Sequence, residues 1–448
     1  MASYLYRNSP VPTSEKTFTF STWLKMSDAS TSADNGIVEW YKSSSERYQI
    51  LIDSTTRQLR LYAVESGTVK INIYTDMAFR DVNAWYHIVI HSDNTQASAS
   101  DRFKLWVNGV SQTFSTYTWS FSQGVNINVF DGSSTRLNLG TRGEAYATWL
   151  NGYLADTYYI DGSLIDYTQF GETDSTTGEW KPKLDPTISS FGNAGIHLKY
   201  ENSSNIGLDS SGNTNNFTAS GTITQTQDNP SSVFATLNPL SANCTLSNGN
   251  TTWAGTTSGY EHSSATLGVS SGKYYWEVKP TNACGAMGIT DFNWQAQKIG
   301  SVIYASSGYA WVYEGNGYVS HDSYGDISSS YSSYGSSDII GVALDLDNNK
   351  LYFHKNGTYE NSGDPTSGST GTGAISIDAP STLPSGFYSP LVADLCSATA
   401  GGGSVNFGNG YFGTTAISSE GTNASGIGKF EYDVPAGYTA LSTKGLNE

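Results

Sequence analysis

The same short pattern occurs twice in this chain, once in each half. Residues 85–110 (WYHIVIHSD, a polar stretch, then RFKLWVNGV) and residues 339–358 (IIGVALDLDNNKLYFHKNGT) each contain an alternating apolar segment, a turn and a second such segment. Both patterns run into Asn-Gly, at Asn108-Gly109 and Asn356-Gly357. Because Asn-Gly tolerates the positive φ angles of a type I′ turn, each pair predicts a further hairpin. The repeat therefore predicts two antiparallel β domains in tandem.

Composition favours an all-β fold. Charged residues make up 14% of the chain, against about 25% in an average protein, while 13% are aromatic and 30 are tyrosine. We find no long window with apolar residues at i, i+3, i+4 and i+7, so at most about one residue in ten should be helical. A chain of 448 residues is too long for one ordinary core, since domains average roughly 150 residues. We expect two β-sandwiches.

Short alternating segments bounded by polar turns predict the strands. In the first half these are 18–25, 36–41, 48–53, 58–64, 69–74, 85–92, 103–107, 137–140, 152–160 and 196–200. In the second half they are 274–279, 286–290, 309–313, 339–346, 351–354, 388–393 and 405–407. The Ser/Asn/Thr/Gly-rich stretch between the halves predicts a connector. The expected organisation is a first domain over 1–202, a connector over 203–233 and a second domain over 234–448.

Charge and cysteine content exclude several classes of protein. A formal net charge of −17 disfavours nucleic acid and anionic lipid as partners. The N-terminus lacks a signal-peptide pattern and no apolar run approaches roughly 18 residues, so we expect synthesis in a cytoplasm and no membrane insertion.

Cys244, Cys284 and Cys396 support neither a disulfide framework nor a zinc site. We interpret them as small buried hydrophobic residues.

No catalytic constellation is recognisable. Some jelly-roll glycosidases carry paired carboxylates on one strand as E-x-D-x-x-E, within about 5.5 Å of each other, and this motif is absent. Glu39 and Glu46 flank a predicted turn, and Asp345 and Asp347 precede another. The G-x-S-x-G match at 268–272 is followed by a strand rather than a helix, which indicates a turn. We expect the protein not to be an enzyme.

Calcium is the one metal that the sequence leaves open, and no cofactor is otherwise expected. Asp93-Asn94, Asp101 and Asp131-Gly132 lie in predicted turns. Asp and Asn in turns also bond their own backbone without an ion, and this is the favoured interpretation.

Five other residues are expected to build or border cores. Tyr309, Trp311 and Tyr313 alternate along one strand, and a sandwich core is the favoured explanation, with a binding face as the alternative. His87 and His354 have no carboxylate or cysteine at metal-ligand spacing, so core or rim packing is expected for both.

The aromatic-rich loops of the second half carry the functional argument. Tyr combined with Ser and Gly is typical of adaptable binding surfaces, where rigid rings sit on a flexible backbone. The candidate binding residues are Trp294, His321, Tyr324, Tyr331 and Tyr334. A solvated or intersubunit role for the loop 321–337 remains the alternative. Replacing its three tyrosines is expected to leave folding intact, because we expect none of them in a core.

Both halves resemble known β-sandwich families. FTFSTWLK, WYHIVI, FKLWVNG and LNGYLADTYYIDGSLI resemble the laminin-G-like branch of the concanavalin A-like jelly rolls. GKYYWEVK, GVALDLDNNKLYFHKNG and YSPLVADLCSATAGGGSVNFG resemble a SPRY domain. The resemblance implies two tandem antiparallel β-sandwiches, a concanavalin A-like jelly roll followed by a SPRY-like sandwich. Both are widespread binding scaffolds.

The order of the remaining motifs is more specific. FGETDSTTGEWKPK, GLDSSGNTNNFT, FATLNPL and FEYDVPAGYTALSTKGLNE, in that order, resemble virion proteins of tailed bacteriophages, especially marine ones. The resemblance implies a non-enzymatic virion protein, a tail or fibre component that recognises a host-surface glycan or protein. Its expected partners are other virion proteins and further copies of itself. A carbohydrate-active enzyme and a cellular lectin-like adhesin are the alternatives.

Overall fold

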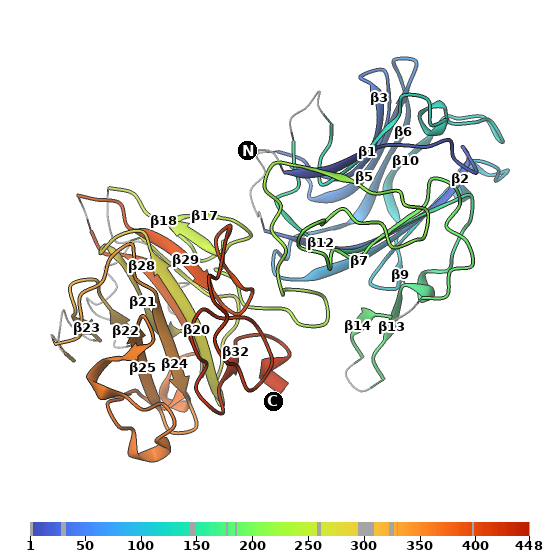
Figure 1. The fold of residues 1–448 in the computed structure, drawn as a ribbon. Helices are drawn as coiled ribbons and strands as arrows, with labels where there is room; N and C mark the ends of the chain where they lie inside the picture. Colours follow the sequence, from blue (N-terminus) through green and yellow to red (C-terminus); the bar gives the residue numbers. More distant parts are fainter. Residues whose placement is uncertain are drawn as a thin grey trace. The chain divides into compact units, whose positions relative to one another are not determined.

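The computed structural model describes residues 3–27, 33–143, 148–175, 178–183, 186–257, 261–293, 309–321, 327–328, 330–396 and 398–447. The chain divides into two compact units, Met1–Gln225 and Thr226–Glu448 (Figure 1). Each unit contains two large β-sheets whose strands are mainly antiparallel, which confirms the predicted all-β fold class.

Helical structure in the described part of the chain is limited to single 3₁₀ turns, and no described helix could cross a membrane. These turns are η1 (Ala99–Asp101), η2 (Asn128–Phe130), η3 (Tyr167–Gln169), η4 (Glu360–Ser362), η5 (Gly368–Thr370), η6 (Pro380–Thr382) and η7 (Gly445–Asn447).

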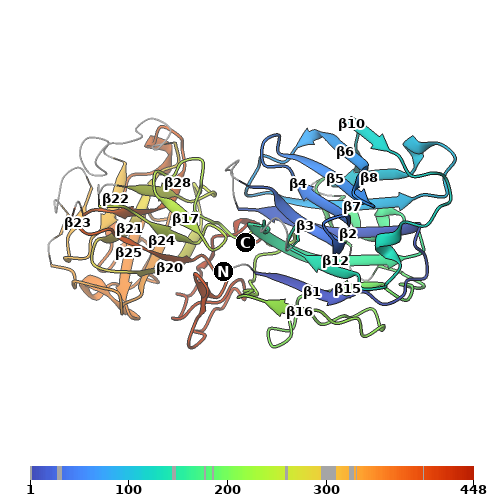
Figure 2. The same ribbon diagram turned by 90° about the horizontal axis from the view of Figure 1, so that it is seen from above.

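The first unit is a sandwich of an eight-stranded and a six-stranded sheet, counted over its described residues (Figure 2). The spatial order of the larger sheet is β10 (Phe114–Trp119), β6 (Thr68–Ala78), β5 (Gln58–Glu65), β4 (Glu46–Ile52), β3 (Asn35–Ser43), β11 (Arg136–Leu139), β1 (Tyr4–Asn8) and β16 (Thr218–Ser220). The smaller sheet consists of β15 (Ile196–Leu198), β12 (Gly152–Asp161), β2 (Thr17–Met26), β7 (Trp85–Asp93), β8 (Phe103–Val107) and β9 (Val110–Ser111). Alternate residues of both sheets point inward. They form one core that includes Phe18, Trp40, Ile50 and Leu61.

The outer face of the six-stranded sheet is covered by the chain that follows β12. A small second core there consists of Val89, Tyr158, Ile160 and Phe170. In this covering segment β13 (Gly171–Thr173) pairs with β14 (Trp180–Pro182). The indole Nε1 of Trp180 donates to Nδ1 of buried His87 at 2.9 Å. This face is therefore largely occupied by the protein itself.

The second unit is a sandwich of a nine-stranded and a five-stranded sheet, again counted over the described residues. The larger sheet has the order β17 (Thr245–Ser247), β18 (Thr252–Ala254), β29 (Gly402–Asn406), β20 (Lys273–Pro280), β24 (Ile340–Asp345), β25 (Lys350–Lys355) and β26 (Thr358–Tyr359), with β27 (Ile375–Ser376) beside β25 and β32 (Thr439–Ala440) beside β20. The smaller sheet consists of β19 (His262–Ser264), β28 (Tyr388–Asp394), β21 (Gly285–Asp291), β22 (Ala310–Tyr313) and β23 (Val319–Ser320). A separate hairpin pairs β30 (Tyr411–Phe412) with β31 (Thr415–Ala416).

The beginning and the end of the second unit lie side by side. The backbone N–H of Ala235 donates to the carbonyl oxygen of Leu441 at 2.9 Å. Phe234 forms a β-bridge with Ser442, and β32 adds to β20 in parallel. The segment that contains β32 and Ser442 is thus part of the larger sheet.

Both Asn-Gly pairs form the predicted hairpins. The φ angles are 48° and 75° at Asn108 and Gly109, and 50° and 83° at Asn356 and Gly357. The first pair joins β8 to β9, and the second joins β25 to β26. Positive φ at two successive residues matches the twist of the flanking strands, which is why Asn-Gly is favoured here.

The boundary between the units follows Gln225 and lies within the predicted connector at 203–233, most of which packs on the first unit. Residues up to Gln225 belong to the first unit. β16 lies within this stretch and pairs with β1, and Phe217 is buried in the first core. The side-chain amide of Gln225 donates to the carbonyl oxygen of Tyr200 at 2.6 Å. The polar composition hid a three-residue edge strand that protects the open edge of β1.

Candidate functional site

The predicted binding loop of the second unit is only partly open to solvent. The structure describes His321, Tyr331 and Tyr334, whereas Trp294 and Tyr324 lie outside the described residues. Tyr334 is 4% exposed and belongs to the main core of the unit. The prediction that the loop tyrosines lie outside the core is therefore wrong for Tyr334. A ring in a Ser/Gly-rich segment can still reach the core, because such a flexible backbone folds back easily.

The other described loop aromatics also pack on the smaller sheet. The ring of His321 stacks on Trp311 with centroids 4.0 Å apart. Tyr331 meets Tyr313 edge-to-face at 5.4 Å. Trp311 and Tyr313 are buried, and Tyr309 packs against the same core, so the core interpretation of this strand is confirmed.

We expect Tyr334→Phe to lower the free energy of unfolding of the second unit by about 1–2 kcal/mol. The hydroxyl group of Tyr334 donates to the carbonyl oxygens of Tyr313 at 2.8 Å and Gly285 at 3.0 Å, and its removal leaves buried acceptors without this partner. Urea denaturation measures the change. Tyr331→Phe is the control, because Tyr331 is only half-buried. Equal stability of the two variants would contradict the prediction.

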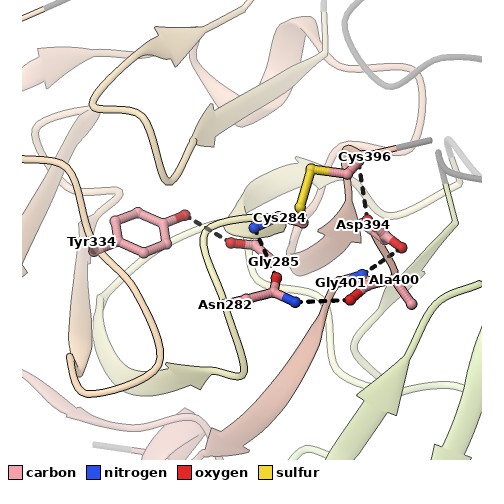
Figure 3. The surroundings of a disulfide bond; sticks show 8 residues. All are labelled: Asn282, Cys284, Gly285, Tyr334, Asp394, Cys396, Ala400 and Gly401. Atoms are coloured by element: carbon pink, nitrogen blue, oxygen red, sulfur yellow. Dashed lines mark hydrogen bonds between the residues drawn. A yellow bond between two sulfur atoms is a disulfide. The ribbon is translucent and has the colours of Figure 1, made fainter. Parts of the chain in front are cut away.

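Two of the three cysteines form a disulfide, which corrects the prediction that all three are free and buried. Cys284 and Cys396 are bonded, with Cα atoms 5.3 Å apart and a sequence separation of 112 (Figure 3). The sequence offered no signal for this pair because its spacing is long and a third cysteine is present. Cys244 is free and partly buried. Burial raises the pKa of its thiol to about 12.

The carboxylates singled out in the sequence do not pair with each other. Glu39 is buried in β3 and accepts hydrogen bonds from the amides of Gln49 (2.5 Å) and Asn138 (3.3 Å). Glu46 instead lies at the end of the β3–β4 hairpin, opposite Ser43. Burial raises the pKa of Glu39 to about 7, although both amide bonds oppose the rise.

Asp345, the other carboxylate considered, is also engaged within the fold. It is buried and its Oδ2 lies 3.0 Å from Nζ of Lys273. Its Oδ1 accepts the backbone N–H of Asn348 at 3.0 Å, as expected for a residue that opens a tight turn.

Glu39 lies in a continuous polar row across the outer face of the eight-stranded sheet. Strand register places these residues side by side in the order Tyr6, Asn138, Glu39, Gln49, Tyr62 and Asn72. Gly143 covers the centre of the row: its φ is +85°, and a Cβ atom there would lie 2.3 Å from Glu39 Oε2. The two ends of the row remain half-exposed.

At one end of the row, four half-exposed residues form what we name the Arg60 patch: Arg60, Tyr62, Asn72 and Tyr74. The guanidinium carbon of Arg60 lies 4.3 Å from the ring centroid of Tyr62 and 4.9 Å from that of Tyr74. Its Nε donates to Oδ1 of Asn72 at 2.9 Å. Cation–π contacts of this kind hold the side chains in place before any ligand arrives.

At the other end, Arg136 lies over the ring of Tyr6 at 3.9 Å and within 5.8 Å of Tyr4. Each end therefore presents flat rings and guanidinium donors from a rigid sheet. Such groups stack on sugar rings or planar side chains and donate to hydroxyl or carboxylate oxygens. The sequence signal for these patches is the alternation Arg60-x-Tyr62 and Asn72-x-Tyr74, which places each pair on one strand face.

Two of the three aspartates considered for calcium, Asp93 and Asp131, cap turns. Oδ1 of Asp93 accepts the backbone N–H of Thr95 at 2.9 Å, and Oδ1 of Asp131 accepts that of Ser133 at 2.7 Å. Asp101 starts no such turn but lies 4.0 Å from Lys104. Over the described residues, no three His, Cys, Asp or Glu side chains gather as a metal site would require. Turn capping explains Asp93 and Asp131 without an ion.

Comparison with known proteins identifies the fold of the first unit. Residues 2–164 match the family model described as the Concanavalin A-like lectin/glucanases superfamily. No curated protein matches the sequence. The first unit is therefore a lectin-like jelly roll.

Several solved structures are similar to parts of the chain. One is the SPRY domain of human HERC1, with 18% identity, a TM-score of 0.29, and coverage of 38% of this chain and 96% of that one. Another is a heptameric pentraxin from Limulus polyphemus, with 14% identity, a TM-score of 0.27, and 37% and 72% coverage. A third is tailspike protein 2 of Escherichia coli O157:H7 bacteriophage CAB120, with 13% identity, a TM-score of 0.28, and 36% and 21% coverage.

Proposed function

We propose that this protein is a non-enzymatic recognition protein of a bacteriophage virion, in which the first unit contacts a host-surface glycan or protein. The virion assignment rests on the ordered motifs that resemble phage virion proteins. The proposal places the mature protein on a tail or fibre, among other virion proteins and further copies of itself. The proposed function requires no cofactor. Whether binding depends on calcium is tested below with a calcium chelator.

The Arg60 patch is the observation that carries the recognition role. Tyr62 and Tyr74 hold Arg60 between them on the outer face of the eight-stranded sheet, where all three side chains are half-exposed. Tyr and Arg are the residue types enriched at energetic hot spots of binding surfaces. A rigid strand pair that presents them loses little conformational entropy when a ligand binds.

Two observations support a role without catalysis. Retaining glycosidases require two carboxyl groups about 5.5 Å apart, and inverting enzymes require about 6.5–9.5 Å. Glu39, which has a strongly raised pKa, is hydrogen-bonded to two amides and covered by Gly143. The paired-carboxylate motif is also absent from the sequence.

We expect the full chain to bind at least one member of a panel of immobilised bacterial surface polysaccharides, and Tyr62→Ser/Tyr74→Ser to weaken that binding by at least about tenfold. The loss follows because the rings that hold Arg60 are removed while the inward-facing core residues remain. Surface plasmon resonance measures affinity, with and without a calcium chelator, and a reducing-end assay tests for cleavage.

Tyr411→Ser is the matched control, since Tyr411 is a half-buried tyrosine of the second unit. Unchanged binding by the double variant would remove the Arg60 patch from the site. Cleavage of a bound polysaccharide would overturn the non-enzymatic role.

A further inference from the structure

The disulfide joins two of the places where the second unit crosses between its sheets. Residues 281–284 connect β20 of the nine-stranded sheet to β21 of the five-stranded sheet, and residues 395–401 connect β28 back to β29. Cys284 lies in the first crossing and Cys396 in the second (Figure 3). The bond therefore closes one end of the sandwich covalently.

Hydrogen bonds hold both cysteines in position for this bond. Oδ1 of Asp394 accepts the backbone N–H of Cys396 at 3.0 Å, and its Oδ2 accepts that of Gly401 at 2.7 Å. In the other crossing, Oδ1 of Asn282 accepts the backbone N–H of Cys284 at 2.9 Å.

The same asparagine links the two crossings directly. Nδ2 of Asn282 donates to the carbonyl oxygen of Ala400 at 2.8 Å (Figure 3). The backbone N–H of Leu395 also donates to the carbonyl oxygen of Cys284 at 3.0 Å. These contacts do not involve sulfur, so they bring the two thiols together before oxidation.

The disulfide also borders the anchor of the tyrosine-rich loop. Gly285, whose carbonyl oxygen accepts the hydroxyl group of Tyr334 at 3.0 Å, directly follows Cys284 in the chain (Figure 3). Tyr334 is the described loop residue that is inserted in the core. Any loosening of the first crossing is therefore transmitted to the point where this loop is held.

We propose that Cys284 and Cys396 form a redox-dependent lock, open as two thiols in a reducing cytoplasm and closed in an oxidising environment, that fixes this end of the second unit together with the Tyr334 anchor. Disulfides persist in oxidising surroundings and are rare where thiols are kept reduced. Both cysteines are only partly buried, so a small oxidant or reductant can reach them. The lock does not depend on the proposed recognition function.

Closure proceeds by exchange with a low-molecular-weight disulfide such as oxidised glutathione. One cysteine thiolate attacks a sulfur atom of that disulfide and expels one glutathione thiolate. The second cysteine, after losing its proton, attacks the mixed disulfide and expels the other. Two cysteine thiols are thereby oxidised to one disulfide, and oxidised glutathione is reduced to two glutathione molecules.

Thiol titration of the full chain, unfolded after the redox reagent has been removed, tests whether the lock exists. After incubation with oxidised glutathione we expect one free cysteine, Cys244, and after incubation with dithiothreitol three. Mass spectrometry of non-reduced peptides should recover 284 linked to 396. Three free thiols after oxidation, or a different linkage, would overturn the proposal.

Hydrogen exchange tests whether the bond fixes this end of the unit. We expect amides in 281–290, 331–338 and 395–402 to exchange at least about tenfold faster in the reduced protein, with no change in the first unit. Because the closed loop is long, the melting temperature of the second unit should fall by about 10 °C on reduction.

Cys396→Ser should behave like the reduced protein and respond to neither reagent, whereas Cys244→Ser should behave like wild type. If the serine variant fails to fold, the comparison of oxidised and reduced wild type still decides the question. Equal exchange in the two redox states would overturn the lock. Failure of the protein to bind any polysaccharide would contradict the recognition role alone, because the lock is judged by the difference in hydrogen exchange between the oxidised and reduced protein.

Discussion

Glu277→Ala is expected to lower the free energy of unfolding of the second unit by about 3–5 kcal/mol, because it leaves several buried donors without their acceptor. Glu277 is buried in β20. Its Oε1 accepts the hydroxyl group of Tyr275 at 3.0 Å and the backbone N–H of Tyr432 at 2.8 Å. Its Oε2 accepts the backbone N–H of Glu431 at 2.9 Å and the amide of Asn406 at 3.3 Å. One carboxylate thus holds the segment around residue 431 against the larger sheet.

A chain of hydrogen bonds reaches Glu277 from the Asn356-Gly357 turn. The backbone N–H of Gly357 donates to Nδ1 of His354 at 3.1 Å, so the proton of the neutral ring is on Nε2. Nε2 then donates to the hydroxyl oxygen of Tyr275 at 2.7 Å, and Tyr275 donates onward to Glu277. Burial lowers the pKa of His354 to about 4, so the ring stays neutral at physiological pH.

Denaturation in urea, followed by hydrogen exchange of residues 429–434, measures the effect of Glu277→Ala. Exchange in that segment should rise more than elsewhere in the unit. Glu420→Ala is the control, because Glu420 and its ion-pair partner Lys429, 3.1 Å away, are both exposed. If both variants unfold at the same urea concentration, Glu277 does not anchor the segment.

The second large effect concerns the pH dependence of the first unit. Relative to wild type, Glu39→Gln should become more stable by about 3 kcal/mol as pH rises from 4 to 8. Burial raises the pKa of Glu39 from 4.5 to about 7 in the folded state. The stability that this group contributes is therefore complete below pH 4.5 and is lost as pH rises through 7. Glutamine does not titrate, so the variant lacks this loss.

His87 has the opposite effect in wild type and cancels in the difference. Burial lowers its pKa from 6.5 to about 3, so its contribution is complete above pH 6.5 and falls as the solution is acidified. Burial also raises the pKa of Glu277 to about 7. Because Glu277 lies in the second unit and titrates in the same pH range as Glu39, the stability of each unit has to be measured separately, by hydrogen exchange of its own peptides. A difference between Glu39→Gln and wild type that does not change with pH would show that Glu39 keeps an ordinary pKa.

The strands and hairpins could be predicted because their signals are local. Alternation marked β2, β7, β20 and β24 to within two residues, and Asn-Gly fixed two turns through the φ angles it permits. Edge strands such as β16, which is Thr-Ala-Ser, are too short to show such a signal. Their position follows from the open edge they cover, which only the assembled sheet defines.

The candidate sites were harder to predict because they depend on distant pairings. Cys284 and Cys396 are brought together by the pairing of β21 with β28, across 112 residues. Glu39 meets Asn138 only through the neighbouring strands β3 and β11. Tyr334 was wrongly predicted to lie outside the core. The Ser/Gly-rich composition of its loop favours solvent exposure, yet its ring is packed in the core of the second unit.

The adjacent ends of the second unit have a consequence for its biosynthesis. Val233 and Thr443 are joined by a backbone-to-hydroxyl hydrogen bond across 210 residues, and β32 enters the sheet beside β20. While a ribosome is still making residues before 439, the larger sheet lacks this part and Phe234 lacks its bridge to Ser442. Contacts of such long sequence separation form slowly, since loop closure precedes any gain from packing. The second unit therefore completes its fold only after residue 443 has emerged, whereas the first unit can already be folded by then.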